Sequence, residues 1–128
     1  MSWQSYVDDQ LVGSGQLASA AIVNLSEATV SARSSSFPEI TDEEISAIID
    51  GYKSPNSFYD NGFTIGGTAY MAVKADERSV YGKKEATGVC MAKTSQLLII
   101  GVYDEKNQPS SAALVVEKLA DFFIENGY

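Results

Sequence analysis

The sequence predicts an α+β domain in which helices pack on the faces of an antiparallel sheet. Three observations favour this class. The second half of the chain contains consecutive short apolar runs separated by polar turns, which is typical of a β-meander. Amphipathic helical patterns occupy both ends of the chain. A hairpin pattern and a third helical pattern lie between them. We therefore expect the order helix, hairpin, helix, meander, helix. At 128 residues, the chain has a length that fits one domain, residues 1–128.

The first helix is expected over residues 2–12. On a period of 3.6 residues, one face carries several large side chains and Leu11 lies at its margin. The members of that face are Trp3, Tyr6, Val7 and Gln10. The sequence Gly-Ser-Gly at residues 13–15 then ends the helix.

Residues 17–25 fit either a helix or a strand, and we prefer a strand. The following Ser-Glu-Ala-Thr resembles a turn, so residues 29–32 would return as the second strand of a hairpin.

The middle helix has the best-defined start in the sequence. Thr41 and Glu44 form a capping box, and Ile40 and Ile45 occupy the positions of a hydrophobic staple. An apolar stripe follows on one face: Ile45, Ile48, Ile49 and Tyr52.

The meander begins with residues 63–65 and 68–75, which flank the two-residue turn Gly66-Gly67. Further strands are expected at residues 78–84, 88–94 and 96–104. Pro109 then starts the last helix. Its core stripe contains Ala112, Val115, Val116, Leu119 and Phe123.

Composition excludes several functions. The chain has no histidine and one cysteine, Cys90, which rules out a histidine-dependent nucleophilic triad and a cysteine zinc site. No spacing suggests a carboxylate or lysine pair for catalysis, so we expect neither an enzyme nor a cofactor. The net charge of −8 argues against broad nucleic-acid binding.

Targeting signals are also missing from the pattern. No apolar run approaches the ~20 residues that span a bilayer, and no signal peptide is visible. We expect a cytosolic protein.

Four aromatic residues lie near the chain ends: Trp3, Tyr6, Phe122 and Tyr128. If the terminal helices pack side by side, these rings converge. Adjacent aromatic rings dock extended proline-rich segments, which are already stiff and lose little entropy on binding. The alternative is that the rings only join one helix to the other.

Two further features indicate a protein interface or an ordinary solvated surface. Leu114 points nearly opposite the core stripe of its helix, on the side of Lys118. A basic group falls within twenty positions and would suit an acidic protein surface or lipid phosphates. Its members are Lys74, Arg78, Lys83, Lys84 and Lys93.

Six segments in order resemble profilins, the small actin-monomer-binding proteins. The N-terminal Ser-Trp-Gln-Ser-Tyr-Val-Asp is similar to the family signature. The others are AAIV, SSSFP, NGFTIGG, YGKK and VVEKLADFFIENGY, as in amoebal and plant members. The resemblance covers essentially the whole chain. It implies that the terminal helices pack on one sheet face and a shorter helix on the other.

The resemblance also implies sites. Trp3, Tyr6, Phe122 and Tyr128 match the polyproline groove of the family. Ser31 stands where many profilins carry a further tryptophan, so we expect a weaker or shifted site. Family actin contacts match Ala72, Lys74, Lys84, Leu114 and Lys118. The candidates for phosphoinositide binding are Arg78, Lys83, Lys84 and Lys93.

The implied function is regulation of actin polymerisation without catalysis. The protein would sequester actin monomers, promote nucleotide exchange and deliver actin to proline-rich partners such as formins. It would be a monomer of the cytoplasm and cytoskeleton. It would also bind phosphoinositides, including phosphatidylinositol 4,5-bisphosphate, although the net charge of −8 opposes this binding. The competing hypothesis is a non-actin α+β interaction scaffold that assembles through its sheet edge, which leaves Trp3 and Tyr128 unexplained.

Overall fold

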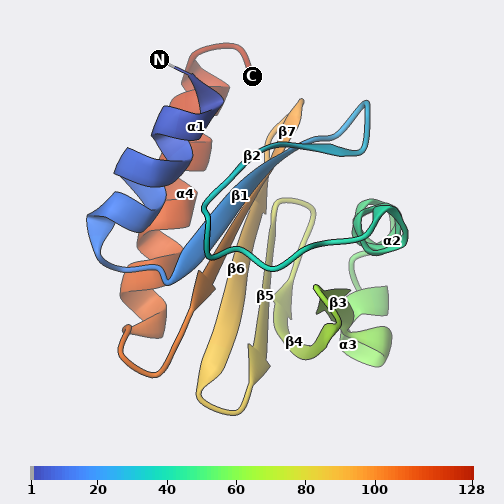
Figure 1. The fold of residues 1–128 in the computed structure, drawn as a ribbon. Helices are drawn as coiled ribbons and strands as arrows, with labels where there is room; N and C mark the ends of the chain where they lie inside the picture. Colours follow the sequence, from blue (N-terminus) through green and yellow to red (C-terminus); the bar gives the residue numbers. More distant parts are fainter. Residues whose placement is uncertain (1) are drawn as a thin grey trace.

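Seven antiparallel strands form one curved sheet in the order β2-β1-β7-β6-β5-β4-β3 (Figure 1). A computed structural model describes residues 2–128. The strands are β1 (Ser19–Asn24), β2 (Thr29–Arg33), β3 (Phe63–Ile65), β4 (Thr68–Ala75), β5 (Ser79–Lys84), β6 (Thr87–Lys93) and β7 (Leu97–Tyr103). The predicted hairpin and meander are therefore confirmed. Pairing of β1 with β7 joins them into one sheet, with Ala21 opposite Ile100.

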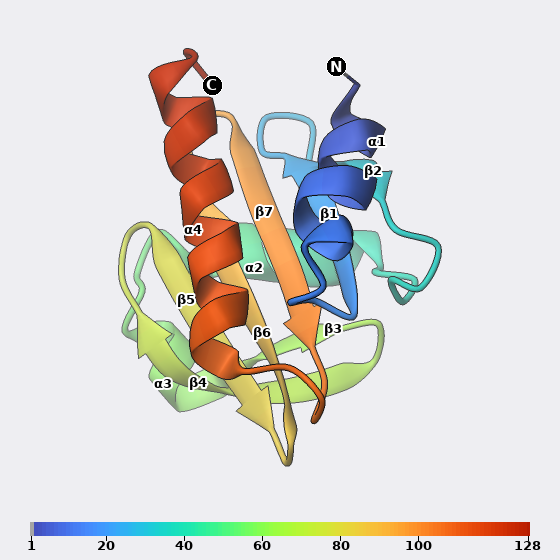
Figure 2. The same cartoon turned by 90° about the vertical axis from the view of Figure 1, so that its left-hand side faces the viewer.

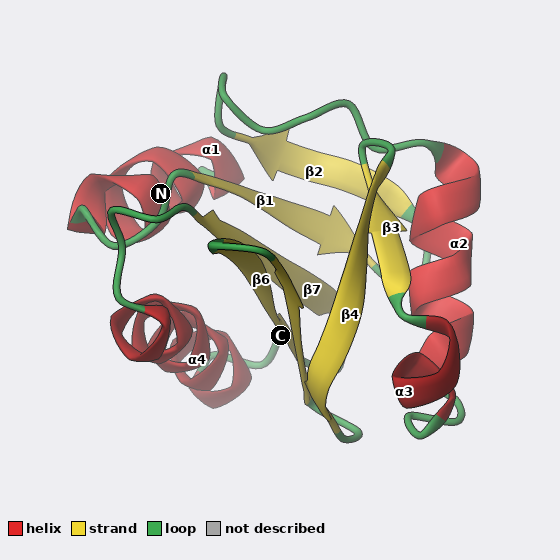
Figure 3. Ribbon diagram, turned by 90° about the horizontal axis from the view of Figure 1, so that it is seen from below, coloured by secondary structure: helices red, strands yellow, loops and turns green. Residues whose placement is uncertain are grey.

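Helices cover both faces of this sheet. The N-terminal helical segment, residues 3–14, lies with α4 (Pro109–Glu125) on one face, and both chain ends lie at the same end of the molecule (Figure 2). The other face carries α2 (Asp42–Gly51) and α3 (Ser57–Asn61) (Figure 3). The predicted fold class is confirmed, and α3 is a short helix that the sequence pattern did not reveal.

The sheet separates two hydrophobic clusters. The cluster under the terminal helices includes Leu11, Ile99, Val116 and Phe123. The cluster under α2 and α3 includes Ile45, Ile48, Phe58, Met91 and Ile100. Successive strand residues point to opposite faces, so Ile99 and Ile100 serve different clusters. A continuous apolar run such as β7 thus reflects burial on both faces.

The N-terminal helical segment changes its winding along its length. It begins as α1 (Trp3–Ser5), continues as a π-helical stretch (Tyr6–Leu11) and ends in a 3₁₀ turn (Val12–Ser14). Ser2 caps its start through the amide of Ser5. π-Helical winding is wider than the 3.6-residue period used for the sequence. Val7 and Leu11 consequently lie in the core, whereas Gln10 is exposed.

No helix in the described part of the chain has the length and apolar character needed to cross a membrane.

Glu44 joins α2 to the β3–β4 turn. The predicted capping box is present: Thr41 Oγ1 accepts from the Glu44 amide at 3.1 Å, and Glu44 Oε1 accepts from the Thr41 amide at 2.9 Å. The same carboxylate also accepts from the amides of Gly66 at 3.0 Å and Gly67 at 2.9 Å. Both glycines have positive φ, which this two-residue turn requires.

The amides around Glu44 favour its charged form. Partial burial opposes ionisation, but the hydrogen bonds from Thr41, Gly67 and Gly66 outweigh it and lower the pKa of Glu44. A carboxylate whose folded pKa is lowered adds stability above its ordinary pKa. That stability disappears as the pH falls through the folded value.

We predict that Glu44→Gln lowers the free energy of unfolding by about 1–2 kcal/mol at pH 7, because charge-assisted bonds to three amides weaken. Urea unfolding at pH 7 and pH 3 measures the effect. The difference from the wild type should shrink at pH 3, where Glu44 is increasingly protonated. Glu43→Gln is the matched control, since Glu43 is exposed and lies on the same helical turn. Equal effects of the two variants would contradict this role of Glu44.

Candidate functional site

Aromatic rings from both chain ends gather on one surface. Trp3 lies 6.1 Å from Tyr6 and 5.1 Å from Tyr128, measured between ring centroids. Tyr6 lies 5.9 Å from Phe122. The packing of the N-terminal helical segment against α4 thus brings the four predicted residues together. We call Trp3, Tyr6, Phe122 and Tyr128 the aromatic cluster.

Phe123 supports this cluster from below. It is 1% exposed, and its ring lies 5.5 Å from Trp3 and 5.0 Å from Tyr6 in edge-to-face geometry. It also lies 6.2 Å from Tyr128. The sequence pattern placed Phe123 only on the core stripe. Its contacts show that one buried ring orients three of the four surface rings.

Tyr128 is held by the turn between β6 and β7. Its carbonyl oxygen accepts hydrogen bonds from the Gln96 amide at 2.8 Å, Thr94 Oγ1 at 2.9 Å and Ser95 Oγ at 2.7 Å. Its own amide donates to the Phe123 carbonyl at 2.9 Å. Sequence spacing could not reveal this anchor, because residues 94–96 and 128 are far apart along the chain.

The aromatic cluster remains accessible. Phe122 is 43% exposed and Tyr128 is 39% exposed, while Trp3 and Tyr6 are half-buried. Among residues 2–128, no hydrogen bond is seen from the Trp3 indole nitrogen or from the hydroxyls of Tyr6 and Tyr128. The surface therefore combines flat apolar rings with hydrogen-bond donors that face solvent.

Ser31 does not extend the cluster. It is exposed at the bulge between β1 and β2, and lines a polar hollow of about 460 Å³ with Gln4, Arg33 and Glu39. Gln4 donates to the Arg33 carbonyl at 2.7 Å across this hollow. A tryptophan at residue 31 would add an aromatic wall here. The aromatic surface consequently ends at Trp3 on its β2 side.

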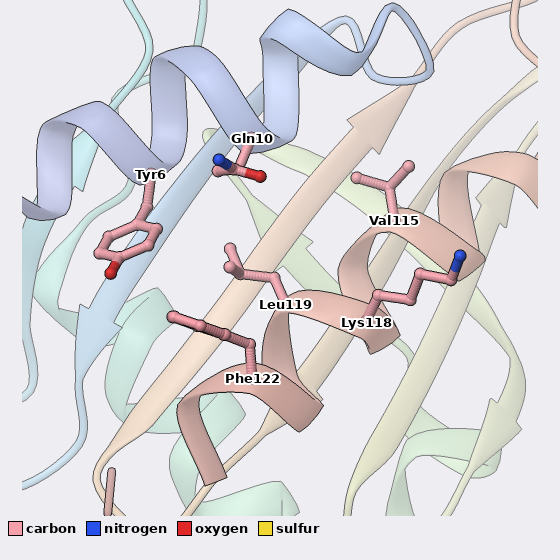
Figure 4. A pocket seen from close by; sticks show the side chains of 6 residues that line it. All are labelled: Tyr6, Gln10, Val115, Lys118, Leu119 and Phe122. Carbon is pink, nitrogen blue, oxygen red and sulfur yellow. The ribbon is translucent and has the colours of Figure 1, made fainter. Parts of the chain in front are cut away.

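A cleft continues the cluster in the other direction. It has a volume of about 330 Å³ and runs between the N-terminal helical segment and α4 (Figure 4). Its lining consists of Tyr6, Gln10, Val115, Lys118, Leu119 and Phe122. We call it the interhelical cleft. Val115 and Leu119 were expected on the core stripe of the last helix, and in the structure they also border this open cleft.

The predicted actin residues divide between the two faces. Leu114 is 54% exposed and Lys118 is exposed on α4. Lys74 lies on the same face, with its Nζ 5.1 Å from the centre of the Tyr81 ring. Ala72 packs instead against the cluster under α2. Lys84 points to that same side of the sheet. Side chains alternate along a strand, and Lys84 lies four residues after Val80 of β5, which belongs to the cluster under α2.

The basic group also separates. Lys83 and Lys84 lie exposed at one end of β5, whereas Arg78 and Lys93 lie at the other. Lys93 Nζ is 5.8 Å from the centre of the Tyr52 ring. The structure therefore does not bring all four predicted phosphoinositide residues into one patch.

Arg78 belongs to a polar network that joins α4 to β5. Its guanidinium lies 3.1 Å from Glu117 Oε1 and 2.9 Å from Asp121 Oδ1. Glu117 Oε2 accepts from Ser79 Oγ at 2.6 Å and from the Tyr81 hydroxyl. Burial and this contact with Glu117 raise the pKa of Tyr81, so its hydroxyl stays a donor. Arg78 is consequently occupied by carboxylates of its own protein.

Among residues 2–128, no group of three or more histidine, cysteine, aspartate or glutamate side chains is arranged to hold a metal ion. Cys90 is buried. Its burial, together with the smaller effect of the nearby Glu117 charge, raises the pKa of its thiol to about 12. The thiol is therefore a poor nucleophile at neutral pH.

We predict that Thr94→Val loosens Tyr128 and changes the environment of Trp3. Valine keeps the shape of threonine but removes the hydroxyl that donates to Tyr128 and accepts from the Leu97 amide at 3.0 Å. The loss in unfolding free energy should be about 1–3 kcal/mol. Trp3 emission should shift to longer wavelength as its contact with Tyr128 opens. Thr94→Ser keeps the hydroxyl and should leave the spectrum unchanged. An unshifted spectrum in Thr94→Val would argue against the anchor.

Comparison with known proteins agrees with this architecture. The family model described as profilin matches residues 1–128. The chain is 49% identical to profilin-P of Physarum polycephalum and 48% identical to profilin-1 of Dictyostelium discoideum, over all of both chains in each case. The crystal structure of profilin II from Acanthamoeba castellanii is 45% identical, with a TM-score of 0.93 over 99% of this chain and all of that one.

A more distant structure shares the fold at 23% identity. It is mouse profilin IIa in complex with a double repeat from the FH1 domain of mDia1, with a TM-score of 0.81 over all of both chains. The relatives named here are all profilins, which supports the expectation of a binding protein rather than an enzyme. The family model and the full-length identities establish that this chain belongs to the profilin family.

Proposed function

We propose that this protein binds actin monomers and proline-rich segments at separate surfaces and thereby regulates actin polymerisation. The observation that carries the proposal is the aromatic cluster: Trp3 and Tyr128 lie at opposite ends of the chain, yet their rings are 5.1 Å apart and accessible. The cluster is larger than helix packing requires, because Phe123 alone already joins the two helices.

Proline-rich segments suit this surface chemically. A polyproline II helix has no internal hydrogen bonds, so its carbonyls are free to accept from a protein. The Trp3 indole and the hydroxyls of Tyr6 and Tyr128 can donate to them. Proline rings pack on the aromatic faces, and the stiff ligand loses little entropy. The FH1 complex of mouse profilin IIa is consistent with such a ligand.

The α4 side of the sheet is the proposed actin surface. Leu114 and Lys118 lie on α4. Lys74 lies beside the ring of Tyr81, whose hydroxyl donates to Glu117 of α4 and so places Lys74 near this helix. Met71 and Val73 on β4 are 76% and 60% exposed, which adds apolar area near Lys74. Exposed apolar side chains with lysines at their edge suit an acidic protein partner. Ala72 and Lys84 point toward the opposite face of the sheet, so they do not belong to this surface.

Two separate sites explain how delivery of actin would work. A protein that holds a monomer at α4 and β4 while its aromatic cluster grips a proline-rich partner raises the local concentration of actin near that partner. Faster nucleotide exchange requires that the protein bind unequally to the states of the actin cleft. Sequestration follows when the covered actin surface is one that filaments need. The proposed location is the cytoplasm and cytoskeleton.

Phosphoinositide binding would depend on few free cations. Arg78 is paired with Glu117 and Asp121, so Lys83 and Lys84 are left as the exposed adjacent pair. Two lysines bring about 2 kcal/mol near an anionic surface, against the repulsion of a net charge of −8. Weak, salt-sensitive binding to phosphoinositide vesicles would be the consequence.

A scaffold that assembles through its sheet edge is the competing function. The free edges belong to β2 and β3. Strand β3 has three residues and β2 has exposed polar side chains at Thr29, Ser31 and Arg33, which are features of edges that avoid pairing. Both edges therefore disfavour assembly by strand pairing. The aromatic cluster, which this alternative does not explain, favours the profilin function.

We predict that Tyr128→Ala weakens binding of a ten-residue oligoproline about tenfold, because one ring and one donor are lost. Leu114→Asp should weaken binding of monomeric actin by about the same factor, since it places a charge in the apolar surface. Each variant should retain the other activity. Calorimetric titration with both ligands tests this, with circular dichroism to verify folding. Loss of both activities in either folded variant would contradict the two-surface proposal.

A further inference from the structure

The interhelical cleft is continuous with the aromatic cluster. Tyr6 and Phe122 belong to both, with ring centroids 5.9 Å apart. From there the cleft follows α4 to Val115, seven residues before Phe122, or about 10 Å at ~1.5 Å per residue. A ligand that lies on Tyr6 and Phe122 therefore has an open path beyond them. On the β2 side of the cluster, Ser31 provides no aromatic ring that could extend the surface.

The cleft has an apolar base and polar margins. Figure 4 shows Leu119 between Tyr6 and Phe122 on one side and Val115 on the other, with Gln10 and Lys118 at the margins. Its base is apolar from Leu119 to Val115. Its margins carry the amide of Gln10 on one side and the ammonium of Lys118 on the other. A fitting occupant is apolar next to the prolines and polar or anionic one step further.

Lys118 is the cation without a carboxylate partner at this site. The neighbouring acids on α4, Glu117 and Asp121, are both paired with Arg78. Among residues 2–128, no carboxylate lies within ion-pair distance of Lys118. Arg78 thus holds the nearest negative charges on the β5 side of the helix and leaves Lys118 free to attract an anion into the cleft.

We propose that the interhelical cleft binds the residues that flank the proline segment of a partner, and that Lys118 forms an ion pair with an acidic residue there. The inference rests on the proposed proline-binding function and concerns the protein without bound actin, because Lys118 also belongs to the proposed actin surface. Lys118 precedes Phe122 by four residues, about 6 Å along α4, which a polyproline II chain covers in about two residues. An apolar residue followed by a carboxylate, directly beyond the prolines, therefore matches Leu119 and then Lys118.

Calorimetric titration with designed peptides tests the inference. The ligands are ten prolines alone, ten prolines flanked by Leu-Glu, and ten prolines flanked by Leu-Gln. Each flank is placed at the N-terminal end in one peptide and at the C-terminal end in another, always with Leu next to the prolines. Both ends are tested because the direction of the chain in the groove is not assumed. The Leu-Glu peptide in one orientation should bind about threefold more tightly than its Leu-Gln counterpart, as expected for a partly exposed ion pair. The preference should decrease at 0.5 M salt.

Two variants assign the preference to the cleft. Lys118→Gln should bind Leu-Glu and Leu-Gln peptides equally. Gln10→Glu, at an exposed position of the N-terminal helical segment, places a competing carboxylate in the cleft and should reduce the preference. Lys106→Gln is the control for loss of one positive charge. It lies exposed before α4 and outside the cleft, so the preference should persist.

The outcomes separate the two proposals. If unflanked decaproline binds but the wild type does not distinguish Leu-Glu from Leu-Gln, the inference is wrong and the proposed function stands. A preference that survives in Lys118→Gln also overturns it. If none of the peptides binds, the proline-binding function fails and the inference fails with it.

Discussion

The packing of the two chain ends around Phe123 is the constraint on which the functional surface depends. This ring is buried, and it contacts Trp3, Tyr6 and Tyr128 in edge-to-face geometry. The N-terminal helical segment and α4 are thereby held side by side on one face of the sheet. Since neither helix carries all four aromatic rings alone, the proposed proline-binding surface forms only in the folded chain.

Separate polar contacts fix the C-terminal end and the middle of α4. At its C-terminal end, the turn between β6 and β7 holds the carbonyl of Tyr128 through Thr94, Ser95 and Gln96. Along its side, Glu117 accepts from Ser79 and Tyr81 and pairs with Arg78. The first set orients the aromatic cluster, and the second positions the surface of Leu114 and Lys118. One helix therefore supports both proposed binding surfaces.

Features encoded by neighbouring residues could be predicted from the sequence, and features that join distant residues could not. The capping box of Thr41 and Glu44 is local and was expected, but the contact of Glu44 with Gly66 and Gly67 depends on how α2 packs. Arg78 looked like one member of a basic group because its partners, Glu117 and Asp121, lie about forty residues later. The aromatic cluster was expected because the four rings lie near the two chain ends and match the groove positions implied by the profilin resemblance. The interhelical cleft was not, since Leu119 and Val115 fit a core stripe equally well.

The most direct test of this account is the fluorescence of Trp3 during titration with an oligoproline peptide. Trp3 is the single tryptophan, so the signal has one source, and it lies between Tyr6 and Tyr128 in the proposed groove. The account predicts a saturable change in emission as proline rings cover the indole. A spectrum that stays constant at high peptide concentration would show that the aromatic cluster joins the terminal helices but does not bind proline-rich ligands.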